Sequence, residues 1–522
     1  MTKSAVKNTE FIVFIKEVDD NLKITIIDPV KEKLVCEELV SKDNFKDFFE
    51  EELIKLQQKL QVVFFLLPKC SYEFCKEAKA MFNSINIPTH FFNDIQLYLA
   101  FMLISAEHVS KTGETVIFIT AFESEAKVYG YKYTKNGYLQ RWILQVKIDD
   151  NKSDENIRTE ILNSCNPNAF FIHANPANMI RLKEIFKAVK KVFTFESNEN
   201  NWNPADMKNV IGYSKWFFDK SYIKYYVQPV SDSKVELFRE SGDVKYPIVT
   251  VAVNDHLPVC HTVVVKKIVN TCFISVQKLS DKNATILETW LPDQNAHQHE
   301  VALSVDEEGF ITYGIKPILL PQIKNLPTWL TKNFKSGVPV IAFFENLSFI
   351  AIHPDGKTEY EFLGSWNGKR CPCDGEFGMD LYISFDKEEP KYCQKALEVA
   401  RIKPNLVVSD LFTIMTLSPE NALQIKNEQF VITKDDENPI LLEFDNFDGN
   451  KNAATPAFLM AMLLKHHLKA IKYAIEEKPK EIAFLIFGDL RKKEVKRAKK
   501  QLTEACEILK VSCQFLDYNN FH

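Results

Sequence analysis

Hydrophobic residues near the start of the chain occur in short runs that polar turns separate. Short continuous or alternating apolar runs are typical of strands, whereas apolar positions three or four apart are typical of helices. The order of hairpin, helix and buried strand occurs twice within the first 217 residues, so the sequence predicts a duplicated α/β core. The predicted elements are hairpin strands 11–15 and 22–27, helix 45–60, strand 62–67, helix 72–84, strand 89–92, hairpin 115–133, strand 169–173, helix 179–189 and a helix through 216.

The pattern changes after residue 217. Residues 222–315 hold six short alternating runs with Asp, Asn, Gly and Pro between them, which predicts a β-sandwich. A proline-containing stretch at 317–339 separates it from a third α/β region, which repeats the order of residues 11–84. The predicted elements of this region are hairpin strands 338–344 and 347–352, helix 457–476, strand 482–487 and helix 491–509.

Glycine is scarce in this chain. The 522 residues include 15 glycines, and no two of them are adjacent. Average usage is roughly 7%. Loops that bind phosphate need glycine, because only a residue without Cβ lets several backbone N–H groups close on an anion. The sequence has no Walker-type loop and no G-x-G-x-x-G, so it lacks the common nucleotide-binding motifs.

Charge, hydropathy and cysteine content narrow the class of protein. A net charge of −5 disfavours a general nucleic-acid binder. No apolar run reaches the roughly 20 residues that span a bilayer, and the first ten residues lack the apolar part of a signal peptide. Eleven irregularly spaced cysteines predict reduced thiols. We therefore expect a cytoplasmic protein that binds neither nucleic acid nor membrane.

Several short motifs, in this order, resemble the heat shock protein 70 chaperones. Residues 301–312 are similar to the last sandwich hairpin of that family, and Asn203-Pro204 followed by Gly212 is similar to the end of its ATPase domain. Residues 367–372 and 402–410 resemble an early lobe of that domain, and 456–463 its crossover unit. In the family, an actin-like ATPase domain precedes a β-sandwich that binds extended peptides.

The resemblance implies an α/β, actin-like (ribonuclease-H-like) ATPase-type core, a β-sandwich and a second, partial actin-like lobe. The first domain lacks room for a large subdomain that the family inserts, and the last region matches only half of such a domain. The implied parts are a reduced ATPase-type domain at 1–220, the sandwich at 221–320, a linker at 321–337 and the partial lobe at 338–522.

The turns that hold nucleotide in the family have lost their glycines here. The first hairpin turn is 16–20 in one copy and 343–346 in the other, and the second turn is 120–127. The adenine-side turn is 174–178, and the position of the family's catalytic lysine aligns with Phe412. The resemblance therefore implies a pseudo-ATPase without a cofactor. ATP and Mg²⁺ belong to an alternative, an ATP-dependent chaperone of the same family.

Other candidate sites are weaker. Asp19 and Asp20 could bind a metal but are typical of a solvated turn. The pairs Cys371/Cys373, His297/His299 and His466/His467 have no second pair at zinc-finger distance, so we expect structural roles. The basic run 491–500 predicts a solvated helix face or a surface for a partner or an anionic surface.

Four apolar sandwich residues align with the family's peptide groove: Val235, Leu237, Cys272 and Ile274. The resemblance implies that they bind peptide, although alternating apolar residues also fill any sandwich core. The arch over the groove would involve Glu240 and Lys266 or Lys267, which are polar here.

The resemblance implies a pseudo-chaperone that binds proteins or extended peptides and is not an enzyme. A scaffold for one defined protein partner is a further alternative. The strand at 482–487 is apolar throughout, so both of its faces need cover. We expect that the lobe's own helices do not fully suffice, and that residues 1–217, the sandwich or a second chain completes the burial.

Overall fold

Three sheets share one strand order in the computed structural model, which describes residues 10–149, 151–196, 207–242, 244–279, 281–366, 369–370, 375–427 and 429–517. The orders are β3-β2-β1-β4-β5, β8-β7-β6-β9-β10 and β20-β19-β18-β30-β31. In each sheet a hairpin pairs antiparallel, and its first strand pairs parallel with a later strand. We name these parts the first, second and third units; the repeated order predicted from the sequence is confirmed.

The first unit has helices on both faces of its sheet. One face packs against the segment 45–59, which runs from α-helix through π-helix to 3-10 helix, and against α2. Ser71 caps α2 by accepting a hydrogen bond from the Phe74 N–H, which fixes the start of this helix where the sequence predicts it. The elements are β1 (Phe11–Val18), β2 (Asn21–Asp28), β3 (Lys33–Ser41), α1 (Phe45–Phe48), β4 (Leu60–Leu66), α2 (Tyr72–Ser84), β5 (Thr89–Phe91) and α3 (Asp94–Ser105).

The second unit shares a core with the first. Helices α3 and α6 lie between the two sheets, in a cluster that includes Phe64, Phe118 and Phe171. Helix α3 is apolar nearly all round because it is buried from both sides. The elements are β6 (Thr115–Ala121), β7 (Glu125–Thr134), β8 (Gly137–Lys147), α4 (Asp154–Leu162), β9 (Ala169–Ala174), α5 (Pro176–Ile185), β10 (Val192–Glu196) and α6 (Met207–Phe218).

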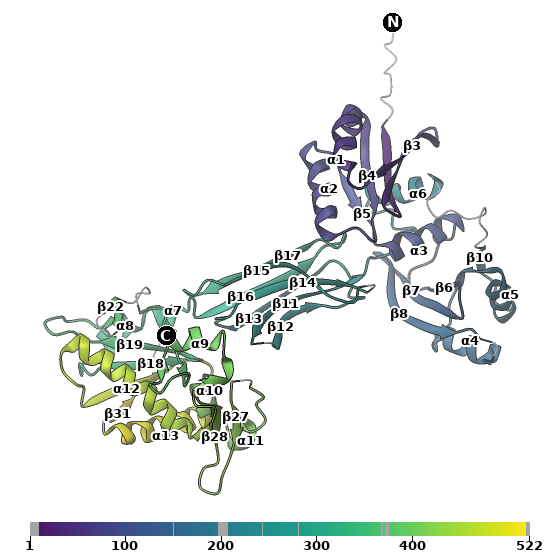
Figure 1. Ribbon diagram of the computed structural model, residues 1–522. Helices are drawn as coiled ribbons and strands as arrows, with labels where there is room; N and C mark the ends of the chain where they lie inside the picture. The colour runs from purple at the N-terminus through teal and green to yellow at the C-terminus, as the bar shows by residue number, and fades with distance from the viewer. Residues whose placement is uncertain are drawn as a thin grey trace.

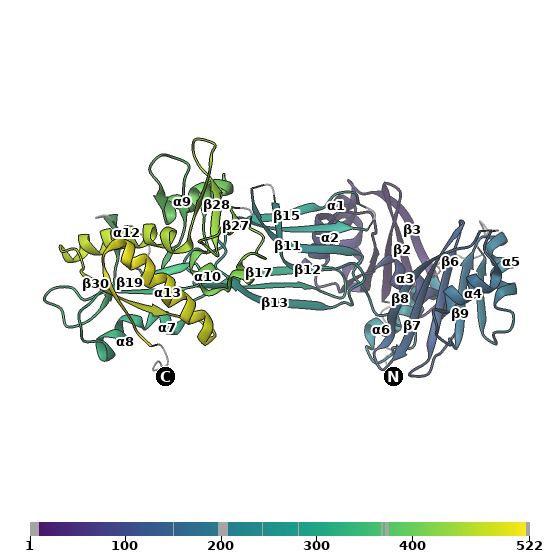
Figure 2. The same ribbon diagram turned by 90° about the horizontal axis from the view of Figure 1, so that it is seen from below.

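Two antiparallel sheets form the sandwich, in the orders β12-β11-β14-β15 and β13-β16-β17. Alternate residues of both sheets meet in one apolar core. The sandwich lies between the first unit and the third in both views of the ribbon (Figures 1 and 2). The strands are β11 (Ser233–Ser241), β12 (Val244–Val251), β13 (Val259–Lys266), β14 (Cys272–Lys278), β15 (Thr285–Trp290), β16 (Gln298–Val305) and β17 (Ile311–Ile318).

The segment predicted as a linker forms two helices, and three of its apolar side chains are buried. Helices α7 (Pro321–Lys324) and α8 (Leu326–Asn333) place Ile323, Leu326 and Leu330 against one face of the third sheet. Residues 321–333 therefore cover one face of strand β30, and this segment is not one of the parts predicted to cover it. The prediction of a plain linker is wrong, because the prolines here stand in the first turn of each helix, where they are tolerated.

The opposite face of the third sheet packs against α10, α12 and α13. The strands of this unit are β18 (Val340–Phe344), β19 (Leu347–Ile352), β20 (Glu361–Phe362), β21 (Ser365–Trp366), β22 (Lys369–Arg370), β23 (Met379–Asp380), β24 (Ile383–Ser384), β25 (Lys391–Tyr392), β26 (Val407–Val408), β27 (Val431–Thr433), β28 (Leu441–Asp445), β29 (Lys451–Ala454), β30 (Glu481–Ile486) and β31 (Ser512–Phe515). The helices are α9 (Gln394–Ala400), α10 (Leu411–Thr416), α11 (Pro419–Ala422), α12 (Pro456–Ile475) and α13 (Lys492–Leu509).

Candidate binding cavity between the sandwich and the third unit

A cavity of about 650 Å³ separates one end of the sandwich from the third unit. The sandwich contributes the ends of β11 and β12 and the loop after β13. The third unit contributes the β18–β19 hairpin turn and the start of α10. Charged side chains from both parts line the cavity: Arg239, Lys266, Lys267, Glu345, Asp380, Asp410 and Lys426.

The sandwich loop 266–270 contacts the third unit through a buried ion pair. The Lys267 Nζ lies 3.1 Å from Asp380 Oδ2, and the two side chains are 8% and 9% exposed. The Arg401 guanidinium donates two hydrogen bonds, of 3.0 and 2.7 Å, to the Val269 carbonyl. A buried charge needs a partner because both ions lose water. The loop therefore has defined partners in the third unit.

The wall formed by the third unit has two non-glycine residues with left-handed backbones. Glu345 in the hairpin turn has φ 51° and Asp410 has φ 55°. Burial raises the pKa of the Glu345 carboxyl, which accepts a 2.9 Å hydrogen bond from Gln298 Nε2 of the sandwich. Lys266 Nζ lies 3.1 Å from Asp410 Oδ1 in a more exposed pair. Such conformations cluster at binding sites, where surrounding contacts hold them.

The four predicted groove residues do not line this cavity. Val235, Leu237, Cys272 and Ile274 are at most 2% exposed and lie in the sandwich core. Burial also raises the pKa of the Cys272 thiol to about 12. The core interpretation of the alternating pattern fits all four side chains, and Val235 also lines a second cavity at the opposite end of the sandwich. The cavity begins further along β11, at Arg239 and Ser241.

The predicted arch forms in part. The Glu240 carbonyl accepts a 2.9 Å hydrogen bond from Asn270 Nδ2, which joins the two loops at this end of the sandwich. Lys266 and Lys267 instead turn toward the third unit. No local sequence pattern marks Asp380, and Asp410, the last residue of the 402–410 motif, was not predicted to line a cavity.

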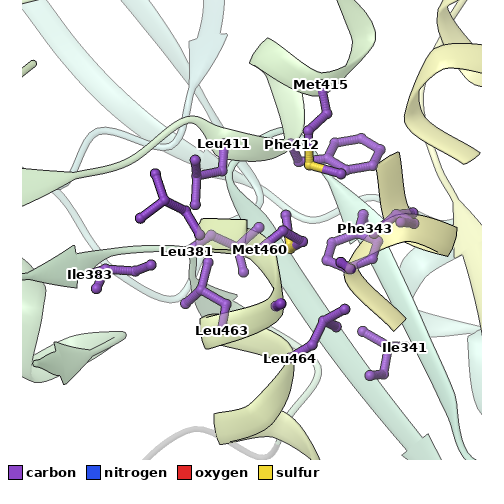
Figure 3. Packing of buried hydrophobic residues seen from close by; sticks show 14 of the residues in the cluster. Ile341, Phe343, Leu381, Ile383, Leu411, Phe412, Met415, Met460, Leu463 and Leu464 are labelled. Carbon is purple, nitrogen blue, oxygen red and sulfur yellow. The ribbon is translucent and has the colours of Figure 1, made fainter. Parts of the chain in front are cut away.

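In the turns that align with the family's nucleotide contacts, side chains of the protein itself occupy the backbone hydrogen-bonding groups. Asn175 Nδ2 donates to the Phe122 carbonyl at 2.6 Å, and Asn178 Nδ2 donates to the Glu123 carbonyl at 2.7 Å. Phe412 is 2% exposed, and its ring stacks on that of Phe343 with centroids 5.0 Å apart (Figure 3). These positions present amides and aromatic rings rather than groups that bind phosphate.

The histidine pairs have structural partners. His297 Nε2 donates to the Glu376 carbonyl and its Nδ1 accepts from Leu320 N–H. His299 Nδ1 accepts from Ile268 N–H. Burial lowers the pKa of His467 to about 3, and its ring bonds Ser348 and the Leu463 carbonyl. Within the described ranges no group of His, Cys, Asp and Glu could hold a metal, and Cys371 and Cys373 lie outside those ranges.

The first unit docks on the opposite end of the sandwich, around a second cavity of about 450 Å³. Lys79 Nζ lies 2.7 Å from Glu308 Oε2 in the β16–β17 turn, and Lys278 Nζ donates to the Pro68 carbonyl at 2.7 Å. The sandwich is therefore held at both ends.

No protein-family model matches this sequence, and no curated protein matches it. Among the described residues no helix is long and apolar enough to cross a membrane.

Proposed function

We propose that this chain is a divergent relative of the heat shock protein 70 chaperones, with actin-like units that have lost nucleotide binding. Its activity is to bind an extended segment of another protein in the cavity between the sandwich and the third unit. The observation that carries the proposal is this cavity of about 650 Å³, lined by the loops at one end of the sandwich. The repeated strand order of the three units supports the family relationship.

The edge of β12 suits an extended ligand. Strand β12 pairs with β11 on one side, and within the described strands no other strand continues the sheet beyond it. Tyr246, Pro247 and Ile248 of β12 line the cavity. A peptide strand added to such an edge gains main-chain hydrogen bonds, while side chains in the cavity give specificity.

The charged lining favours a partner segment with charged residues. The guanidinium of Arg239 lies 4.4 Å from the centre of the Tyr246 ring and faces the same cavity as Lys426. A cationic group in a confined space binds carboxylates by charge-assisted hydrogen bonds. Binding of one such segment would make the protein a scaffold for a defined partner, whereas binding of many apolar segments would make it a general chaperone.

Arg239→Glu is expected to weaken binding of an acidic extended peptide to the full chain about tenfold, which corresponds to roughly 1.4 kcal/mol. The reversed charge repels the peptide carboxylate. Peptides selected from an array would be titrated by fluorescence anisotropy, and Arg141→Glu, an exposed position on β8, is the matched control. Equal affinities for both variants would contradict the assignment of this cavity.

Mg·ATP at millimolar concentration is expected to leave the melting temperature unchanged. A ligand stabilises the folded state by RT ln(1 + [L]/Kd), so a shift of several degrees would reveal binding. The turns carry carbonyls and bulky side chains where phosphate would lie. A thermal-shift titration tests this, and such a shift would favour the ATP-dependent alternative.

A further inference from the structure

The first half of α13 carries a strong local excess of positive charge. Residues 491–500 include seven Lys or Arg residues and one Glu. The side chains of Arg491, Lys492, Lys493, Lys496 and Lys500 are exposed. Arg497 donates to the Thr416 carbonyl, so it has a structural contact. This ten-residue segment has a net charge of +6 and the whole chain −5, so the remaining 512 residues carry −11.

Arg491 pairs with Glu494 at the helix start, and Lys499 pairs with Asp517. The fold does not require the exposed cations Lys492, Lys493, Lys496 and Lys500. Helix α13 packs through Ala498, Leu502, Ala505 and Cys506, so its exposed positions could carry any polar residue. Two of these cations, Lys492 and Lys493, lie in the first turn of the helix, where the macrodipole is already positive and like charge is unfavourable. The arrangement lowers helix stability, which points to a use for the charge.

The chain also carries the complementary surface. Asp43, Asp47, Glu50, Glu51 and Glu52 are exposed between β3 and β4 of the first unit. Lys46 is exposed among them and Lys55 pairs with Glu52, so residues 43–52 carry a net charge of −4. Figures 1 and 2 show α1 and α13 on opposite sides of the sandwich, α1 in the first unit and α13 in the third. The two surfaces therefore lie too far apart to meet within one chain.

We propose that the basic surface of α13 binds the acidic surface at residues 43–52 of a second copy of this chain. A nucleic acid or an anionic bilayer is an extended polyanion. The net charge of −11 on the rest of the chain would repel it. The acidic surface of a second copy is confined to one helical segment. The contact joins two different surfaces, so one copy keeps its acidic surface free, the other keeps its basic surface free, and further copies can add at both ends.

Sedimentation velocity of the full chain tests this association. At about 20 mM salt the average mass is expected to rise with protein concentration above the 60.3 kDa of one chain. At about 300 mM salt the mass returns to that of the monomer, because the surfaces are screened. Two charge-reversal variants, Asp47→Lys/Glu50→Lys/Glu51→Lys and Lys492→Glu/Lys493→Glu/Lys496→Glu, are each expected to remain monomeric at low salt.

An equimolar mixture of the two variants is expected to associate again, because one variant keeps the natural basic surface of α13 and the other keeps the natural acidic surface at 43–52. The α13 variant should also melt at a higher temperature than the natural chain, since acidic residues suit a helix N-terminus. A control variant with the same net charge, Lys282→Glu/Lys316→Glu/Lys335→Glu, changes exposed positions elsewhere and should still associate. A natural chain that is monomeric at low salt, or a mixture that does not associate, would overturn the proposal.

Discussion

Replacing Leu330 by alanine is expected to destabilise the third unit by about 2–5 kcal/mol, the usual cost of deleting buried methyl groups. Leu330 is fully buried in α8 and packs in one cluster with Val340, Leu485 and Phe487. The substitution leaves a cavity beneath the central strands β18 and β30. Hydrogen exchange measured by mass spectrometry on the full chain should show faster exchange in both strands, because their opening free energy falls.

Thr328→Ala is the matched control for this experiment. Thr328 lies in the same helix but is exposed, and its replacement is expected to change stability by no more than about 0.5 kcal/mol. If both variants exchanged at the same rate in β30, residues 321–333 would not be the cover of this face. The third unit would then need a cover from elsewhere, as the sequence alone suggested.

The repeated core could be predicted from the sequence because its signals are local. The runs at 11–15 and 62–67 are apolar throughout, as strands buried on both faces must be, and both form adjacent parallel strands. Helix α8 was not predicted because its proline, Pro327, also suggests a break in a helix. Ile323, Leu326 and Leu330 nevertheless follow helical spacing. A proline near the start of a segment predicts a helix as readily as a break, so the apolar spacing decides.

The cavity could not be predicted because tertiary packing creates it. Lys267 and Asp380 are 113 positions apart, and neither belongs to a recognisable motif. The apolar residues aligned with the groove follow the alternation of any sandwich, and the structure places them in the core. Charged residues at loop ends carry no local sequence signal of burial, because they become buried only when two units dock.

Lys267→Ala is expected to weaken docking of the third unit on the sandwich by about 3–5 kcal/mol, because Asp380 would remain buried without its partner. Undocking hydrates the carboxylate, so the variant should separate the two parts. Small-angle X-ray scattering of the full chain should then give a larger radius of gyration. Faster hydrogen exchange in loop 266–270 and around β23 would locate the change.

Lys266→Ala provides a control at the neighbouring position. The Lys266–Asp410 pair is 49% and 37% exposed, and exposed pairs contribute about 0–1 kcal/mol, so this variant should stay docked. The double variant Lys267→Met/Asp380→Leu removes both charges and should restore docking, since apolar groups of similar size often replace a buried ion pair without loss. If Lys267→Ala behaved like Lys266→Ala, the buried pair would not hold the cavity together, and Arg401 with its bonds to Val269 would be the dominant contact.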